Sequence, residues 1–143
     1  MFLLMLMTLR LLNHSQRDLE WLMDYEITCS SRYRRFFTLI LFTSTDTRHG
    51  VDPLVMGKII RECDRLFVFQ HYGALLMSET DAACAVKAIH RFLAAFLHQE
   101  NLRFAVASYP RDGHTAADLI GLAQGRLERA RRLNQQVIMS GGY

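Results

Sequence analysis

The sequence predicts an α+β fold with a ferredoxin-like β-α-β-β-α-β core, a central antiparallel sheet flanked by helices. Two observations lead to this prediction. Four short segments, at 36–42, 66–69, 74–77 and 103–109, have the length and the apolar or alternating pattern of strands. Between the first and second of these, and between the third and fourth, apolar residues recur every three or four positions, which is typical of amphipathic helices.

A long amphipathic helix is expected before the first strand. Apolar residues recur at three- and four-residue steps from Leu9 to Ile27, and the pattern reaches about Arg34. The opening segment 1–12 is mostly apolar but shorter than the about 20 residues that cross a membrane, so no transmembrane segment is expected. We interpret it as the first turn of this helix, as a surface that packs on a partner, or as the remnant of a fused upstream domain.

The first strand and the helix after it have clear boundaries in the sequence. The continuous apolar run Phe36–Phe42 predicts a buried central strand that ends in the polar turn 43–46. Asp52 suits an N-cap, and Pro53 suits the first helical position because proline lacks the N–H that a first turn leaves unpaired. This helix is expected to end near Glu62.

The next two strands, 66–69 and 74–77, are expected to form a hairpin around the tight turn 70–73. Residues 78–81 have the composition of a helix N-terminus. The helix that follows places apolar residues on one side as far as Phe96.

The last part of the chain repeats this alternation of strand and helix. Arg103–Tyr109 predicts a strand, and the Pro-Arg-Asp-Gly sequence at 110–113 predicts a turn. Thr115 is expected to cap a final helix that reaches Ala130, and 136–139 is expected to return as an edge strand.

Composition favours one domain in a reducing compartment. The chain of 143 residues is half apolar, enough for one core, so we assign 1–143 to a single domain with an N-terminal helix (1–34) and a core (36–139). The three cysteines form no close pair and the histidines lack the spacing of metal ligands, so neither disulfides nor a bound metal is expected. Free cysteines fit a reducing compartment, so the expected location is the cytoplasm. The net charge of +3 comes with no continuous basic run, so DNA is not an expected partner.

A short motif lies just before the hairpin. Arg61 and Asp64 are three positions apart, and five residues separate Asp64 from the tip of the hairpin. The five positions at this tip read Gln70, His71, Tyr72, Gly73 and Ala74. Together with the later Tyr-Pro-Arg-Asp-Gly turn and its helix, this order and spacing resemble the GGDEF family of bacterial diguanylate cyclase domains. The resemblance covers about 17–139 and implies a palm-like GGDEF fold with a rewritten signature turn.

The resemblance also implies that catalysis has been lost. Family cyclases hold two magnesium ions with an aspartate after the first strand and an acidic residue in the signature turn, because phosphoryl transfer needs its charge neutralised. Here Thr43 and Thr45 stand after the strand, and the turn has no carboxylate. We therefore expect a degenerate domain that is not an enzyme and holds no metal. A residual cyclase is the less favoured alternative, for which Asp46 and Asp52 are the only acids nearby.

In the family, the Arg-x-x-Asp motif is an inhibitory site that binds cyclic di-GMP. The resemblance therefore implies that Arg61 and Asp64 contact this ligand, and Arg91 falls close to where the family places a second arginine. Arg65 is expected at the same site because a helix C-terminus carries partial negative charge, which a cation beside Arg61 would help to offset. An arginine can donate twice to a phosphate or to guanine O6 and N7, while a carboxylate can accept from the guanine N–H groups. The simpler interpretation is that Arg61 and Asp64 form a surface ion pair.

The expected function is that of a catalytically inactive cyclic di-GMP receptor in bacterial signalling, such as biofilm regulation. Its output would be homodimer formation or binding of a protein partner through the N-terminal helix. The alternative is a nucleotide-independent interaction module that uses this helix and the hairpin to assemble a larger complex.

Overall fold

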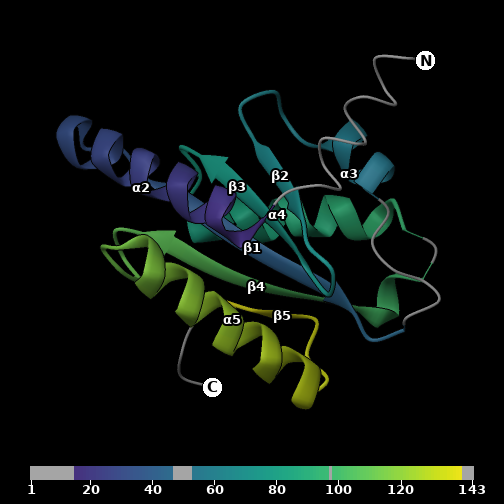
Figure 1. The fold of residues 1–143 in the computed structure, drawn as a ribbon. Coiled ribbons are helices and arrows are strands. Elements are labelled where there is room, and N and C mark those ends of the chain that lie inside the picture. The colour runs from purple at the N-terminus through teal and green to yellow at the C-terminus, as the bar shows by residue number, and fades with distance from the viewer. Residues whose placement is uncertain (1–14, 47–52, 97, 140–143) are drawn as a thin grey trace.

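A computed structural model of the chain describes residues 15–46, 53–96 and 98–139, and its centre is a five-stranded sheet in the order β2-β3-β1-β4-β5 (Figure 1). The strands are β1 (Phe37–Ser44), β2 (Arg65–Val68), β3 (Gly73–Ser78), β4 (Leu102–Tyr109) and β5 (Val137–Ile138). The helices are α2 (Gln16–Tyr33), α3 (Pro53–Ile59), α4 (Ala82–Ala94) and α5 (Ala116–Arg132), with a short 3-10 helix, η1 (Gln99–Asn101), before β4.

The sheet topology confirms the predicted fold class. Strand β1 pairs antiparallel with β3 on one side and with β4 on the other, and β2 pairs antiparallel with β3. With α3 between β1 and β2 and α4 between β3 and β4, the chain follows the β-α-β-β-α-β order of a ferredoxin-like core. The short β5 adds to β4 in parallel, as the edge strand expected near 136–139.

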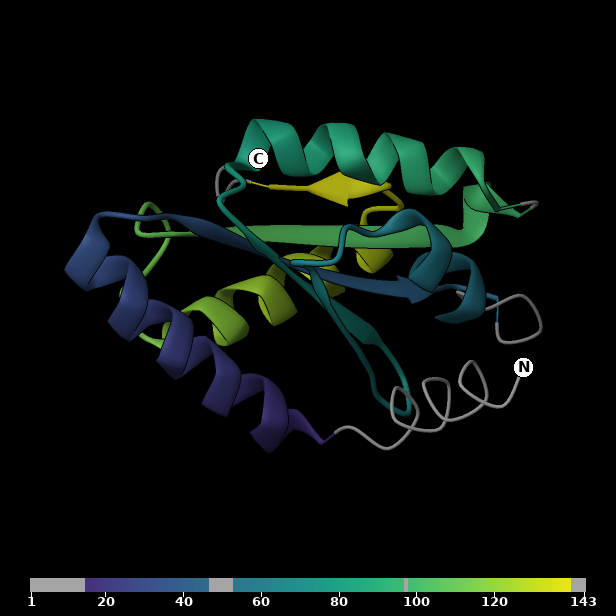
Figure 2. The same cartoon turned by 90° about the horizontal axis from the view of Figure 1, so that it is seen from above.

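Helices cover both faces of this sheet (Figure 2). Leu39 and Leu41 of β1 pack on the face covered by α2 and α5, where Met23 of α2 is fully buried. Ile40 and Phe42 pack on the opposite face, which α3 and α4 cover. Because β1 is buried on both faces, its sequence is a continuous apolar run without alternation.

Side-chain caps determine where three helices begin. Ser15 Oγ accepts from Asp18 N at 3.4 Å while Asp18 Oδ2 accepts from Ser15 N at 2.8 Å, so a capping box starts α2. Asp81 starts α4 by accepting from the amide three residues later at 2.8 Å. Thr115 caps α5 in the same way at 3.0 Å, which confirms the prediction for this residue.

Three boundaries differ from the sequence prediction. The helix expected from Leu9 begins instead at Gln16, because Ser15 has an extended backbone and caps it. Helix α3 ends at Ile59, before the expected Glu62, because the residues that follow form a tight turn. Strand β1 continues through Thr43 to Ser44, since both residues keep their pairing with β4. The polar composition at this end of β1 predicted a turn, but pairing with a neighbouring strand overrides that local preference.

Some predictions fall on parts of the chain outside the described residues. These are the interpretation of 1–12 and the N-cap at Asp52. Among the described residues, none of the helices combines the length and the apolarity needed to cross a membrane.

Candidate functional site

Arg61 and Asp64 lie in the tight turn between α3 and β2. Arg61 N donates to Asp64 Oδ2 at 2.9 Å, and Asp64 N donates to the Arg61 carbonyl oxygen at 3.0 Å. The carboxylate thus closes the turn onto the backbone, a role that aspartate often has in turns. The turn brings the two side chains together, as their spacing in the sequence predicts.

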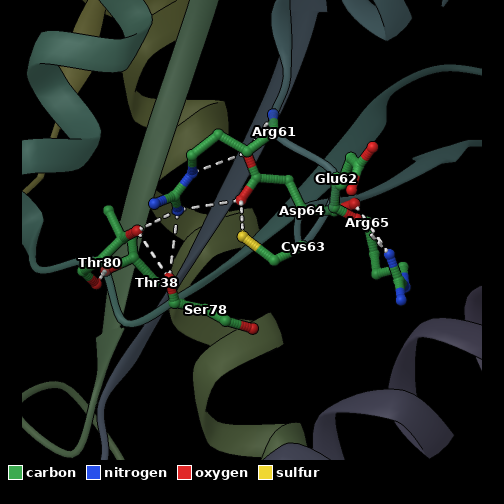
Figure 3. A network of polar contacts seen from close by, with 8 residues as sticks. All are labelled: Thr38, Arg61, Glu62, Cys63, Asp64, Arg65, Ser78 and Thr80. Carbon is green, nitrogen blue, oxygen red and sulfur yellow. Dashed lines mark hydrogen bonds and ion pairs between the residues drawn. The ribbon is translucent and has the colours of Figure 1, made fainter.

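One nitrogen of Arg61, Nη2, is the centre of a polar network at the base of the hairpin (Figure 3). It contacts Asp64 Oδ1 at 3.0 Å, Thr80 Oγ1 at 2.7 Å and the Ser78 carbonyl oxygen at 3.2 Å. Arg61 Nε adds a longer contact to Asp64 Oδ2 at 3.4 Å. These acceptors come from two segments of the chain and fix the guanidinium where β3 leads into α4.

Buried hydroxyl groups connect this network to the strands of the sheet. Thr38 Oγ1 of β1 donates to the Thr80 carbonyl oxygen at 2.6 Å and lies 2.8 Å from Ser108 Oγ of β4. All three of these residues are buried, so Arg61 is tied to the centre of the sheet. Sequence reasoning missed them because single hydroxyl residues in or beside strands have no local pattern that indicates a shared network.

The two charged side chains differ strongly in exposure. The Asp64 side chain is 1% exposed, whereas that of Arg61 is 46% exposed. The hydrogen bond to Asp64 raises the pKa of Arg61, against the lowering effect of partial burial, so the guanidinium stays cationic. Among the described residues, none accepts a hydrogen bond from Arg61 Nη1, which points away from Asp64 in Figure 3.

This difference in exposure gives the two side chains different roles. Both oxygens of Asp64 accept hydrogen bonds from Arg61, so the carboxylate positions the guanidinium. A direct contact from Asp64 to guanine, as the family resemblance implies, requires this side chain to leave the turn. Arg61 can reach a ligand without any such movement.

The other two arginines expected at the site do not converge on Arg61. Arg65 Nη1 donates to the carbonyl oxygens of Glu62 at 2.9 Å and Asp64 at 3.3 Å, and its guanidinium points away from Arg61 (Figure 3). Arg91 is exposed in the last turn of α4. Since α4 begins beside Thr80, Arg91 lies about 15 Å along the helix from the Arg61 network.

The five signature positions form a closed hairpin tip. Exposure falls along them from Gln70 and His71, which are exposed, through the half-buried Tyr72 to Gly73 and Ala74, which are buried in β3. At this tip, Thr43 Oγ1 at the end of β1 donates to the His71 carbonyl oxygen at 2.9 Å.

Two aromatic rings fill the space around this tip. The Phe42 ring covers Gly73, where a Cβ atom would lie 2.2 Å from ring carbon Cζ. The Tyr72 ring packs against Phe69 with ring centroids 4.8 Å apart, and the Tyr72 hydroxyl donates to Gln16 Oε1 at 3.1 Å. The sequence places Tyr72 in the turn but does not predict its contact with Gln16, because nothing in its neighbours shows that α2 passes beside the hairpin.

Gln124 of α5 donates to the Tyr72 hydroxyl at 3.4 Å, so the tip is joined to two helices.

Within the described residues, no group of three or more His, Cys, Asp or Glu side chains is arranged to hold a metal ion. Asp46 lies beyond β1, where its N–H and carbonyl oxygen both contact Ser44 Oγ. Asp52, the other acid considered for a residual cyclase, is outside the described residues.

Comparison with solved structures assigns the fold. The chain matches the GGDEF domain of YfiN (also called TpbB) from Pseudomonas aeruginosa with a TM-score of 0.76 and 15% identity, over 90% of this chain and 96% of that chain. It matches the FimX GGDEF domain from Pseudomonas aeruginosa with a TM-score of 0.71 and 20% identity, over 87% and 92%. This chain has the GGDEF fold.

Two further matches are GGDEF proteins described with a bound partner or ligand. One is a microbial GGDEF domain described in an interaction with cyclic di-GMP, with a TM-score of 0.68 and 14% identity over 87% of this chain and 92% of that one. The other is the diguanylate cyclase SiaD from Pseudomonas aeruginosa in complex with its activator SiaC, with a TM-score of 0.70 and 17% identity over 87% and 57%. No family model matches the sequence, and neither does any curated protein. At these identities, the likeness establishes the GGDEF fold alone.

Proposed function

We propose that this chain is a non-catalytic GGDEF-fold domain that binds cyclic di-GMP through Arg61. The observation that supports this most directly is the half-exposed guanidinium of Arg61, held on one edge by Asp64 and Thr80 and open on the other. A cation fixed in this way has lost its rotamer freedom before any ligand arrives, so binding costs less conformational entropy.

The open edge of Arg61 suits the chemistry of the proposed ligand. Cyclic di-GMP offers phosphate oxygens as well as the O6 and N7 acceptors of guanine, and a guanidinium can donate to either. Asp64 contributes by holding Arg61 and keeping it charged. That a GGDEF domain can bind cyclic di-GMP is known for one of the matched proteins, and here it is a proposal.

We propose the absence of catalysis because of the residues found at the end of β1 and at the tip of the hairpin. By the family resemblance, these are the two places that hold the magnesium ligands in a cyclase. In this chain they are joined directly by the hydrogen bond from Thr43 to the His71 carbonyl oxygen, and neither residue supplies a carboxylate. Neutral hydroxyl and amide groups are poor substitutes for the anionic ligands that a triphosphate-bound magnesium ion requires.

Binding is tested by isothermal titration of the full chain with cyclic di-GMP. Arg61→Lys keeps a cation near Asp64 but removes the fork, so we expect affinity to fall at least about tenfold while the unfolding midpoint changes little. Arg65→Lys is the matched control, because this arginine points away from the network and should bind as the unmodified chain does. Equal affinity of the Arg61→Lys variant would place the ligand elsewhere.

Catalysis is tested separately by incubating the protein with GTP and Mg²⁺ and separating the nucleotides. We expect no cyclic di-GMP to form. Detection of this product above a boiled-protein blank would contradict the non-catalytic part of the proposal.

A nucleotide-independent interaction module is the second candidate, and exposed aromatic residues on α2 favour it. Trp21, Tyr25 and Tyr33 are all more than half exposed on this helix. A folded chain that gives no heat with cyclic di-GMP would support this alternative over the receptor.

A further inference from the structure

Arginine and aromatic residues are concentrated where α2 ends and the chain turns into β1. Residues 32–36 read Arg-Tyr-Arg-Arg-Phe, and all five are exposed, so we call them the arginine corner. The corner lies at the end of the sheet where β4 also ends, because Phe37 pairs with Tyr109. The turn after β4 adds the exposed Arg111 at the same margin of the molecule (Figure 1 and Figure 2).

The backbone of the arginine corner is held at both of its ends. Arg34 has a left-handed conformation with a φ of 53°, and its N–H donates to the Ser30 carbonyl oxygen. The Arg35 N–H donates to the same oxygen at 2.9 Å. At the other end, Glu79 N donates to the Phe36 carbonyl oxygen at 2.9 Å. The exposed side chains therefore extend from a fixed backbone.

Two exposed rings lie among these arginines. Tyr33 is 59% exposed, and the central guanidinium carbons of Arg32 and Arg35 lie 5.7 Å and 5.5 Å from the centre of its ring. Phe36 is 43% exposed and adds a second ring. Aromatic rings and guanidinium planes are both surfaces on which unpaired nucleic-acid bases stack. The corner therefore combines a stacking surface with positive charge.

The arginine corner has a surplus of positive charge. Its five residues contain three arginines and no acid, and Glu79 forms an ion pair with Arg35 in which Oε1 lies 3.8 Å from Nε. Three positive groups and one negative group give a net charge of +2. The end of α2 contributes only about half a negative charge. The corner as a whole therefore attracts anions.

We propose that the arginine corner binds single-stranded nucleic acid, with bases stacked on Tyr33 and Phe36 and phosphates held by the arginines. An unpaired strand offers the flat faces of its bases together with regularly spaced negative charge. A corner of five consecutive residues is too small to follow a duplex, which needs a broader basic face. This site uses no residue of the Arg61 network, so it holds or fails independently of cyclic di-GMP binding.

Binding is tested by the fluorescence anisotropy of labelled strands of about ten nucleotides, titrated with the full chain. The two probes are oligouridylate and its deoxy counterpart, and their difference reports on the 2′-hydroxyl groups. We expect single strands to bind at least about fivefold more tightly than a mixed-sequence duplex of the same length, because a duplex offers no free base faces. No binding of either strand, or equal binding of the duplex, would overturn the proposal.

Base stacking is tested with a matched pair of tyrosines. Tyr33→Ala should lower the affinity for the strand at least about fivefold, and Tyr33→Trp should retain it, because a ring is again present. Tyr25→Ala is the control, since Tyr25 is 57% exposed on the same helix about two turns before the corner. Tyr25→Ala should bind as the unmodified chain does. An equal loss in both alanine variants, or no loss in either, would contradict stacking at the corner.

The phosphate contacts are tested by the dependence of binding on salt. With three arginines at phosphates, affinity should fall about twentyfold between about 50 and 200 mM salt. Arg32→Gln should reduce the slope of log affinity against log salt by about 0.7, the contribution of one phosphate contact. Arg17→Gln removes an exposed arginine at the opposite end of α2 and should leave the slope unchanged. The same slope in all three proteins would mean that the strand binds elsewhere.

Two further measurements separate this proposal from other anionic partners and from the Arg61 site. Inorganic polyphosphate has the charge of a strand but no bases, and displacement of the strand by an equal concentration of phosphate groups would contradict base recognition. Co-sedimentation with vesicles that contain phosphatidylglycerol, without binding to either strand, would assign the corner to a membrane surface and overturn the proposal. Arg61→Lys should bind the strand as the unmodified chain does, whatever its affinity for cyclic di-GMP.

Discussion

The two ends of the β2–β3 hairpin differ in chemistry although they belong to one pair of strands. At the base, a half-exposed guanidinium is held by a buried carboxylate and a buried hydroxyl. At the tip, an aromatic ring covers Gly73, and Thr43 contacts the backbone of the turn. The base presents a positioned charge to solvent, while the tip is filled by uncharged groups that stabilise the fold. The comparison shows that one hairpin can present a positioned charge at one end while the side chains at its other end serve the packing of the fold.

Removing the cation at the base should give the largest loss of stability. Arg61→Ala leaves Asp64 buried with a backbone N–H and the weak contact of the Cys63 thiol as its partners. We expect a loss of about 2–3 kcal/mol in the free energy of unfolding, below the usual cost of breaking a fully buried pair because Arg61 is itself half exposed. Urea denaturation measures this loss. Arg65→Ala should cost less than about 0.5 kcal/mol, and a similar cost for both variants would mean that Asp64 does not depend on Arg61.

Adding a methyl group at the tip should have the next largest effect. In Gly73→Ala the new Cβ would overlap the Phe42 ring, and we expect a loss of about 1–3 kcal/mol in unfolding free energy. The double variant Gly73→Ala with Phe42→Leu should lose less than the sum of the two single changes, because the smaller side chain makes room. Additive losses in urea denaturation would show that the ring and the glycine do not interact in solution.

Removing one hydroxyl at the tip should have a smaller effect. Tyr72→Phe keeps the ring against Phe69 but loses the contacts with Gln16 and Gln124. We expect a loss of about 0.5–1.5 kcal/mol, together with faster amide hydrogen exchange in the first turn of α2. Unchanged exchange there would mean that the hydroxyl does not hold the hairpin to this helix.

The smallest expected effect is a change in how far acid lowers the stability of the fold, produced at Asp81 near the base of the hairpin. The hydrogen bond from the Cys84 amide lowers the pKa of Asp81 below its ordinary 3.8. The stability that this adds is therefore present above that value and is lost as pH falls through the lower pKa of the folded chain. Asp81→Asn keeps a capping group that does not titrate, so the drop in urea midpoint between pH 7 and pH 3 should be smaller than in the unmodified chain. An equal drop in both proteins would contradict the role of Asp81.

Most of the fold follows from local sequence patterns. The run of apolar residues in β1 predicted a strand buried on both faces, and the Thr115 cap and the helix after it were found where expected. The end of α3 was less predictable, because Ile59 and Ile60 continue an apolar pattern although the chain turns there. The hydrogen bond that closes this turn is made by the Asp64 side chain, and the spacing of apolar residues does not predict it.

The candidate site was only partly accessible to sequence reasoning. The three-residue spacing of Arg61 and Asp64 predicted that they lie together. The hydrogen bonds that hold Arg61 come also from Thr80 and Ser78, which are distant in the chain and which the spacing does not indicate. Arg65 was assigned to the same site as a cation that would help Arg61 offset the partial negative charge of a helix end. It begins β2, and its side chain donates back to the turn on the side away from Arg61.

The order of the strands has a consequence for how the molecule associates. The two edges of the sheet are its shortest strands, β2 with four residues and β5 with two. Short edges expose few unpaired backbone groups, so they are poor templates for strand addition by another chain and lower the risk of aggregation. Recognition between copies or by other proteins is thereby directed to helix surfaces and loops, where side chains and not backbone pairing determine the partner.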